Sequence, residues 1–148
     1  MTKPHISLLR KNGNHLLALT RVGADNRLWA TAADGKPFRI TRQQLVWETD
    51  VIVLDSNLAQ WLVKADQLAS ETNLEEAWLL VQGEVPVLSL SDLAELVWSS
   101  PVGGTHLGAL LLCLFTAPLR YFQPDGDMLV PFTEEDVTQQ IEKQDQQD

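Results

Sequence analysis

Residues 5–22 read HISLLRKNGNHLLALTRV, two short apolar segments separated by Asn12, Gly13 and Asn14. Gly and Asn tolerate the positive φ angles that tight hairpin turns require. The stretch therefore predicts a β-hairpin whose strands run over residues 5–10 and 15–22.

Two further apolar segments follow this hairpin, at residues 27–32 (RLWATA) and 37–40 (PFRI). Turn-forming residues precede each of them, GADN at 23–26 and DGK at 34–36. Four or five short antiparallel strands in under 50 residues are typical of a small barrel. We expect a small antiparallel β-barrel, cold-shock-like or SH3-like, over residues 1–50.

From Val51 onward the spacing of apolar residues changes from about 2 to about 3.6, which indicates helices. Apolar stripes predict helices that begin near residues 58, 74, 90 and 105. Side chains that accept hydrogen bonds from backbone N–H groups precede three of them. These expected caps are Asp55 or Ser56, Asn73, and Ser89 paired with Asp92. Gly83 is expected to end the second helix.

The apolar flanks at residues 119–122 and 128–132 surround the turn sequence PDGD at 124–127, which predicts a second hairpin. Several helices followed by a hairpin are the element order of a winged helix-turn-helix, here over residues 51–133. Residues 133–136 open a last helix that we expect to fade into the polar residues 139–148. The predicted class is α+β: a small barrel, a winged helix, and a C-terminal helix or linker over residues 134–148.

The chain has 148 residues, 45% of them hydrophobic, which fits one ordinary packed domain or two very small ones. Its one cysteine, Cys113, cannot form an intramolecular disulfide and is expected to be an inert buried thiol. The apolar run at 107–119 is shorter than the roughly 20 residues that span a membrane, and residues 1–10 lack the apolar segment of a secretory signal. We therefore expect a cytoplasmic protein without a membrane partner.

The net charge of −9 conceals a division along the chain. Residues 1–47 carry eight basic and two acidic residues, a charge of +6, whereas residues 48–148 carry three basic and 18 acidic residues, a charge of −15. This asymmetry suggests two modules with different partners. A drift of surface charge without function is the other interpretation.

Motifs of catalysis are missing from the sequence. It has no nucleophile elbow, phosphate loop or dinucleotide fingerprint, and its three histidines lack the spacing of a metal site. Asp125 and Asp127 could hold a metal in a stand-alone hydrolase, but turn hydrogen bonds explain them more simply. Gly103 and Gly104 could hold an anion at a helix start, although an inter-helix turn is favoured. We expect no active site, metal or cofactor within this chain.

Duplex DNA is not an expected partner. A winged helix that reads DNA inserts its recognition helix into the major groove, where Arg, Lys, Asn or Gln contact base edges. The corresponding helix, residues 105–115, contains none of these four residue types. The acidic half would also repel phosphates.

The basic barrel fits single-stranded RNA better. Small barrels bind single strands by stacking bases on aromatic rings while Lys and Arg follow the phosphates. The candidate stacking platform is Trp29, which could equally belong to the core, while Phe38 is assigned to the core. The candidate phosphate contacts are Lys3, Arg10, Lys11, Arg21, Arg27, Lys36, Arg39 and Arg42.

Four segments together resemble a known family. They are TRQQLVWE at 41–48, LEEAWLL at 74–80, SLSDLAEL at 89–96 and the hairpin at 121–132. In this order they resemble the N-terminal region of the ribonuclease II/R (RNB) exoribonuclease family, in which a cold-shock-like barrel and a winged helix precede the catalytic domain.

The resemblance implies a part in RNA degradation. The family's enzymes are processive 3′ to 5′ exoribonucleases that hold magnesium with aspartates of the catalytic domain, and no residue here matches that cluster. It implies an accessory region that admits single-stranded RNA to a catalytic domain, which is then a partner of this chain. The alternative is a protein–protein docking module that does not contact nucleic acid.

Overall fold

A computed structural model of the chain describes residues 4–98, 102–116 and 120–146. Its strands are β1 (His5–Lys11), β2 (Asn14–Val22), β3 (Leu28–Thr31), β4 (Pro37–Arg39), β5 (Leu45–Glu48), β6 (Leu88–Ser89), β7 (Phe122–Asp125) and β8 (Met128–Pro131). Its helices are α1 (Leu58–Glu71), α2 (Glu75–Val81), α3 (Leu90–Val97), α4 (Gly104–Thr116) and α5 (Glu134–Gln146). This mixture of helices and antiparallel sheets confirms the α+β class.

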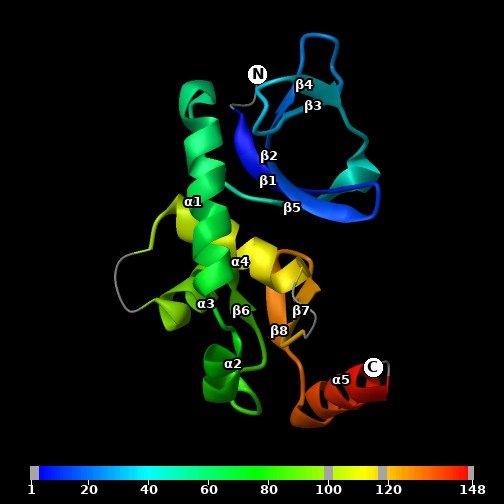
Figure 1. Ribbon diagram of the computed structural model, residues 1–148, viewed down its shortest axis with the longest axis vertical. Coiled ribbons are helices and arrows are strands. Elements are labelled where there is room, and N and C mark those ends of the chain that lie inside the picture. The colour runs from blue at the N-terminus through cyan, green and yellow to red at the C-terminus, as the bar shows by residue number, and fades with distance from the viewer. Residues whose placement is uncertain (1–3, 99–101, 117–119, 147–148) are drawn as a thin grey trace.

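The first five strands form one antiparallel sheet in the order β4-β3-β2-β1-β5. The sheet curls strongly, so that its two ends approach each other in space (Figure 1). β4 and β5 are nevertheless its edge strands, and no pairing between them is found in the described part of the chain. The expected small barrel is therefore seen as a curled, open sheet.

The turns of this sheet use the residues that the sequence pattern indicated. Asn12 and Gly13 have φ angles of 54° and 81°, and Asn26 and Gly35 have φ angles of 62° and 75°. These are left-handed conformations that Gly and Asn adopt at low cost. The predicted hairpin turns are confirmed, and they set the register of the strands.

The two faces of the curled sheet are buried in different ways. Ile6, Leu8, Leu17 and Leu19 belong to a large core shared with the helices. The opposite, concave face encloses a smaller cluster of Leu9, Ala18, Ala30 and Ile40, with Phe38 packed against it. The first face is therefore the one on which the rest of the molecule is built.

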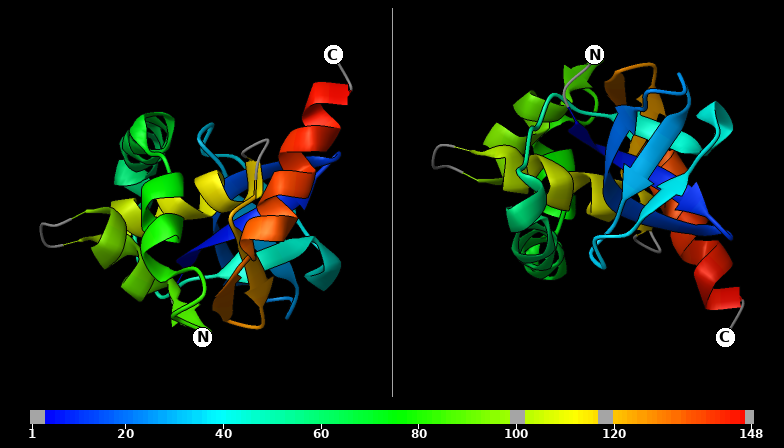
Figure 2. Two further views of the ribbon diagram at one scale, coloured as in Figure 1. Left: turned by 90° about the horizontal axis from the view of Figure 1, so that it is seen from below. Right: turned by 90° about the horizontal axis from the view of Figure 1, so that it is seen from above.

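The helical part contains a three-stranded sheet in the order β6-β8-β7, formed because Leu88 pairs with Leu129 and Phe122 with Pro131. The buried core runs without a break from the curled sheet through α1 and α4 to this small sheet. The indole Nε1–H of Trp78 in α2 donates to the Phe132 carbonyl at 2.6 Å and so ties α2 to the chain entering α5. Helix α5 extends away from the body (Figure 2).

A glycine at the junction allows the curled sheet and the helices to pack closely. A Cβ atom on Gly108 of α4 would lie 2.6 Å from Cη2 of Trp61 in α1 and 3.3 Å from Cδ1 of Leu17 in β2. No real Cβ contact is as short as the first. Gly108 therefore lets α1, α4 and the sheet pack closely at one point.

Two local predictions are confirmed and two are wrong. Ser89 and Asp92 exchange hydrogen bonds as a capping box, and Asn73 Oδ1 accepts the Glu75 N–H. The start of α1 has no side-chain cap, because residues 55–57 form a 3-10 turn instead.

The second wrong prediction concerns α5, which continues through residues 139–146 instead of fading. Glu, Gln and Lys are good helix formers, so the helix does not need an apolar stripe there. The predictions for Ser99, Ser100, Pro101, Pro118 and Leu119 lie outside the described residues.

Candidate nucleic-acid interface

Arg21, Trp29 and Arg39 form a row across three neighbouring strands. Arg21 of β2 pairs with Trp29 of β3, and Trp29 pairs with Arg39 of β4. Directly paired residues project from the same face of an antiparallel sheet. The Trp29 side chain therefore stands between two arginine side chains, and we call these three residues the Trp29 row.

The Trp29 indole is held in place by the β2–β3 turn. Its Nε1–H donates to Asp25 Oδ1 at 3.2 Å, and the same oxygen accepts the Arg27 backbone N–H at 3.1 Å. The Trp29 hydrogen bond is the main reason why the pKa of Asp25 is lowered. The indole also lies against Gly23, where an added Cβ would be 2.8 Å from Trp29 Cδ1. Trp29 is half-buried, so part of the ring faces solvent in a fixed orientation.

The arginines of the row are not neutralised by the protein. Arg21 is half-buried and its Nη2–H donates to Thr31 Oγ1 at 3.4 Å, while Arg39 is exposed. Among the described residues the only ion pair joins His5 and Glu48. Both guanidinium groups of the row can therefore contact an anion.

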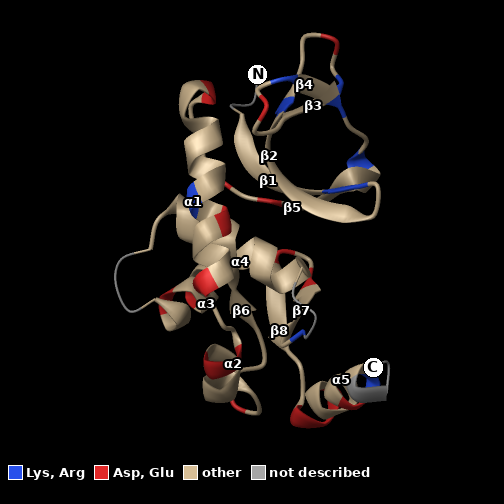
Figure 3. Cartoon of the chain, viewed as in Figure 1, with Lys and Arg blue, Asp and Glu red and all other residues tan. Residues whose placement is uncertain are grey.

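The other candidate phosphate contacts are spread over the curled sheet. Arg27, Lys36 and Arg42 are exposed in turns that flank its strands. Figure 3 shows Lys and Arg gathered around this sheet, whereas Asp and Glu lie over α1, α2, α3 and α5. Lys3 lies outside the described residues.

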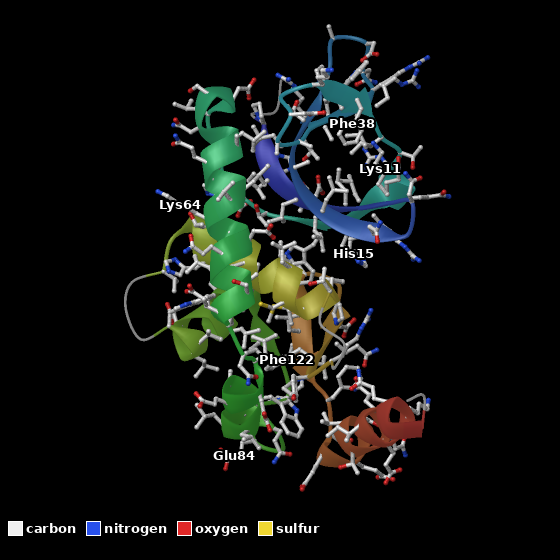
Figure 4. The ribbon with its side chains drawn as sticks, viewed as in Figure 1. Lys11, His15, Phe38, Lys64, Glu84 and Phe122 are labelled. Atoms are coloured by element: carbon white, nitrogen blue, oxygen red, sulfur yellow. The ribbon has the colours of Figure 1, made fainter. Side chains whose placement is uncertain are left out.

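Lys11 and Phe38 lie on the opposite face from the Trp29 row. The Lys11 ammonium lies 4.2 Å from the centre of the Phe38 ring, and Phe38 packs on the concave cluster (Figure 4). This position supports the interpretation of Phe38 as a core residue. Trp47, the third aromatic residue of the basic part of the sequence, faces the shared core and is only 8% exposed, so it offers no stacking surface.

Arg10 belongs to a second basic group, at the seam between the sheet and the helices. It pairs with His15 across β1 and β2, and the His15 ring contacts the Phe115 ring of α4 at a centroid distance of 5.5 Å. Burial lowers the pKa of His15, and the nearby charges of Arg10 and Arg120 lower it further. The sequence offered no signal for this group, because Phe115 and Arg120 are about a hundred residues away from Arg10 and His15 in the chain.

A pocket of about 610 Å³ opens beside His15. Helices α1 and α4 form most of its wall, and Tyr121 also lines it. Cys113 also lines it, but this thiol donates to the Ala69 carbonyl at 3.4 Å and burial raises its pKa. The sequence predicted an inert buried thiol, and Cys113 is buried.

The metal and anion interpretations gain no support from the described residues. Within ranges 4–98, 102–116 and 120–146, no group of three or more His, Cys, Asp or Glu side chains could hold a metal ion. Gly104 has a packing role, since an added Cβ would lie 2.5 Å from Cγ1 of Val51. Asp125 and Asp127 are exposed beside Gly126, whose φ angle of 64° makes the turn between β7 and β8.

Comparisons of the chain with protein-family models, with curated proteins and with solved structures find no match. Among the described helices, none has the length and apolar character needed to cross a membrane. The geometry of the curled sheet and of the seam is therefore what supports a function for this chain.

Proposed function

We propose that this chain binds single-stranded RNA through the curled sheet, and that the Trp29 row is the centre of the interface. The observation that carries the proposal is the alignment of Arg21, Trp29 and Arg39 on three adjacent strands. Neighbouring strands lie about 4.8 Å apart, so each arginine is one strand away from the indole. A base stacked on Trp29 would then have a guanidinium group on either side for its flanking phosphates.

The charge distribution supports the same orientation. RNA that approaches the molecule is attracted by the basic sheet and repelled by the acidic helices, which together carry the excess of negative charge. Contacts made by stacking and by phosphates do not depend on base identity. The proposed binding is therefore tolerant of sequence and sensitive to salt.

The proposal extends to architecture and family. The order α2, β6, α3, α4, β7, β8, with β6 beside β8, is the order of a winged helix, and we assign residues 51–133 to that fold behind a small open barrel. We also propose that the chain is the N-terminal region of a ribonuclease II/R-like 3′ to 5′ exoribonuclease. Its partners are then single-stranded RNA and the catalytic domain, in which magnesium acts.

Fluorescence anisotropy of a labelled single-stranded RNA tests the interface. The double variant Arg21→Gln/Arg39→Gln should bind at least about tenfold more weakly, because two charge-assisted contacts are lost. It should also reduce the slope of log affinity against log salt by about 1.4, since each single-strand phosphate contact contributes about 0.7. Trp29→Leu should weaken binding by about 1–3 kcal/mol through lost stacking.

The control for these variants is Lys64→Gln/Lys143→Gln, which removes the same charge from exposed positions on α1 and α5. It should leave the affinity within about twofold, because neither residue lies on the sheet. Equal weakening by the control would show that only net charge matters. Absence of RNA binding at low salt would remove the proposed function.

A second function is favoured by a different observation. Leu79 and Leu80 of α2 are 56% and 63% exposed, and Leu96 of α3 is 41% exposed, on the acidic part of the molecule. Exposed large apolar side chains of this kind are typical of protein interfaces. A protein-docking role would be insensitive to salt, which separates it from RNA binding in the same titration.

A further inference from the structure

The pocket at the seam contains polar groups that the described residues do not use. Tyr121 and His15 both line it, and neither the Tyr121 hydroxyl nor the His15 ring has a hydrogen-bond partner among the described residues. Figure 4 shows His15 between the curled sheet and α4. The volume of about 610 Å³ lies in the range of small-molecule sites.

Two arginines neighbour residues that line this pocket: Arg10 pairs with His15 across β1 and β2, and Arg120 directly precedes Tyr121. Arg10 and Arg120 are exposed, and both act electrostatically on His15. Arg120 is held by a pair of hydrogen bonds to α5: its N–H donates to Gln140 Oε1 at 2.8 Å, and Gln140 Nε2–H donates to its carbonyl at 2.9 Å. Gln140 of the acidic helix α5 thus fixes the backbone of Arg120.

The charges inside and outside the pocket differ. Asp66 of α1 lines the pocket, and burial, followed by the negative charge of Glu75, raises the pKa of Tyr121. A phosphate group would be repelled by Asp66 inside the pocket and attracted by Arg10 and Arg120 next to it. An uncharged base fits the interior, which is mostly apolar and has hydroxyl and imidazole groups for its edge.

We propose that this seam pocket binds one nucleotide of the RNA, with the base inside against His15 and Tyr121 and the phosphate between Arg10 and Arg120. The inference rests on the proposed function and adds a second contact point, on the same face of the sheet as the Trp29 row but at the other end of β2. His15 and Arg21 are six positions apart on the same strand, about 20 Å at the rise of a β-strand. A single strand that engages both sites must therefore span several nucleotides.

Isothermal titration calorimetry on the full chain with AMP, GMP, CMP and UMP at low salt tests the pocket. At least one should bind, and more tightly than inorganic phosphate or the free nucleoside, because base and phosphate are both recognised. Arg120→Gln should weaken this binding about tenfold and Tyr121→Phe about fivefold, since each removes a hydrogen-bond donor. Lys64→Gln is the control and should change the affinity by less than about twofold, because its charge lies on the exposed side of α1.

Three results would overturn the inference: no binding of any mononucleotide at about 10 mM, binding of inorganic phosphate as tight as that of the nucleotides, or equal weakening by Lys64→Gln. Circular dichroism of each variant checks that it is folded, and Tyr121→Phe keeps the packing of the ring. If RNA binding depends on the Trp29 row while mononucleotides do not bind, only the pocket assignment fails. If mononucleotides bind and RNA does not, the proposed RNA function fails and the pocket remains a mononucleotide site.

Discussion

Trp29 and His15 show how a residue's surroundings decide its chemistry. Trp29 is a large aromatic side chain that most small sheets would bury, yet the hydrogen bond to Asp25 and the contact with Gly23 hold it half-exposed between two arginines. His15 is equally ordinary in the sequence. Burial, Arg10 and Arg120 together disfavour its protonated form.

The lowered pKa of His15 predicts a pH dependence of stability. In the unfolded chain this imidazole has a pKa of about 6.5, so as the pH falls the unfolded state takes up the proton first. The free energy of unfolding should therefore fall more between pH 8 and pH 5 in the unmodified chain than in His15→Gln. Urea denaturation at several pH values measures the difference.

The groups around His15 define the control for that measurement. Burial is the first cause that opposes its protonation, and Arg10 and Arg120 oppose it further, while Asp66 is an acidic residue that lines the same pocket. Added salt screens the contribution of the two arginines, so the difference in pH dependence between the unmodified chain and His15→Gln should shrink at high salt. Part of the difference should persist, because burial is the first cause of the lowered pKa of His15. Identical pH profiles of the two proteins would contradict the assignment.

At the scale of elements, local torsion preferences and capping hydrogen bonds determine where several strands and helices begin and end. The positive φ angles of Asn12 and Gly13 join β1 to β2, and the Ser89–Asp92 capping box begins α3. Helix α5 forms without an apolar stripe because its residues are good helix formers and Thr133 Oγ1 accepts the Asp136 N–H. These elements depend on residues within a few positions of one another.

The capping box is expected to contribute measurably to stability. Ser89 Oγ accepts the Asp92 N–H at 3.1 Å, so Ser89→Ala leaves that donor unsatisfied. We expect a loss of about 1 kcal/mol in the free energy of unfolding. Ser91→Ala in the same helix, at an exposed position, is the matched control and should be neutral or slightly stabilising. Equal effects of the two substitutions would mean that the cap contributes nothing.

At the scale of the whole molecule, one continuous core joins two parts of opposite charge. Leu17 of β2, Trp61 of α1 and Gly108 of α4 meet at the point of closest approach. The same junction brings Arg10 and His15 to Arg120 and creates the pocket. The charge asymmetry of the sequence is therefore built into a single packed body.

This junction can be tested with Gly108→Ala. The added methyl group overlaps Trp61, so the free energy of unfolding should fall by about 1–3 kcal/mol although alanine is the better helix former. Gly103→Ala is the matched control, because no atom of the residues that the structure describes lies within 4 Å of its added Cβ. In a Trp61→Leu background the cost of Gly108→Ala should be smaller, which a double-mutant cycle measures. An unchanged cost would place the strain elsewhere.

Local sequence alone determined the turns, the positions of the helices, the capping box and the α+β class, because each depends on residues that are close in the chain. Tertiary structure decided which of the candidate residues lie together and which of them are exposed. The Trp29 row requires the strand register, since a slip of one residue would turn Trp29 to the other face. The group of Arg10, His15 and Arg120 requires the packing of α4 on β2, which no periodicity encodes. Strand register also places Lys11 and Phe38 on the concave face, and the shared core buries Trp47. Local hydrogen bonds and torsion preferences act over a few residues, whereas a binding surface is assembled from residues that only the folded core brings together.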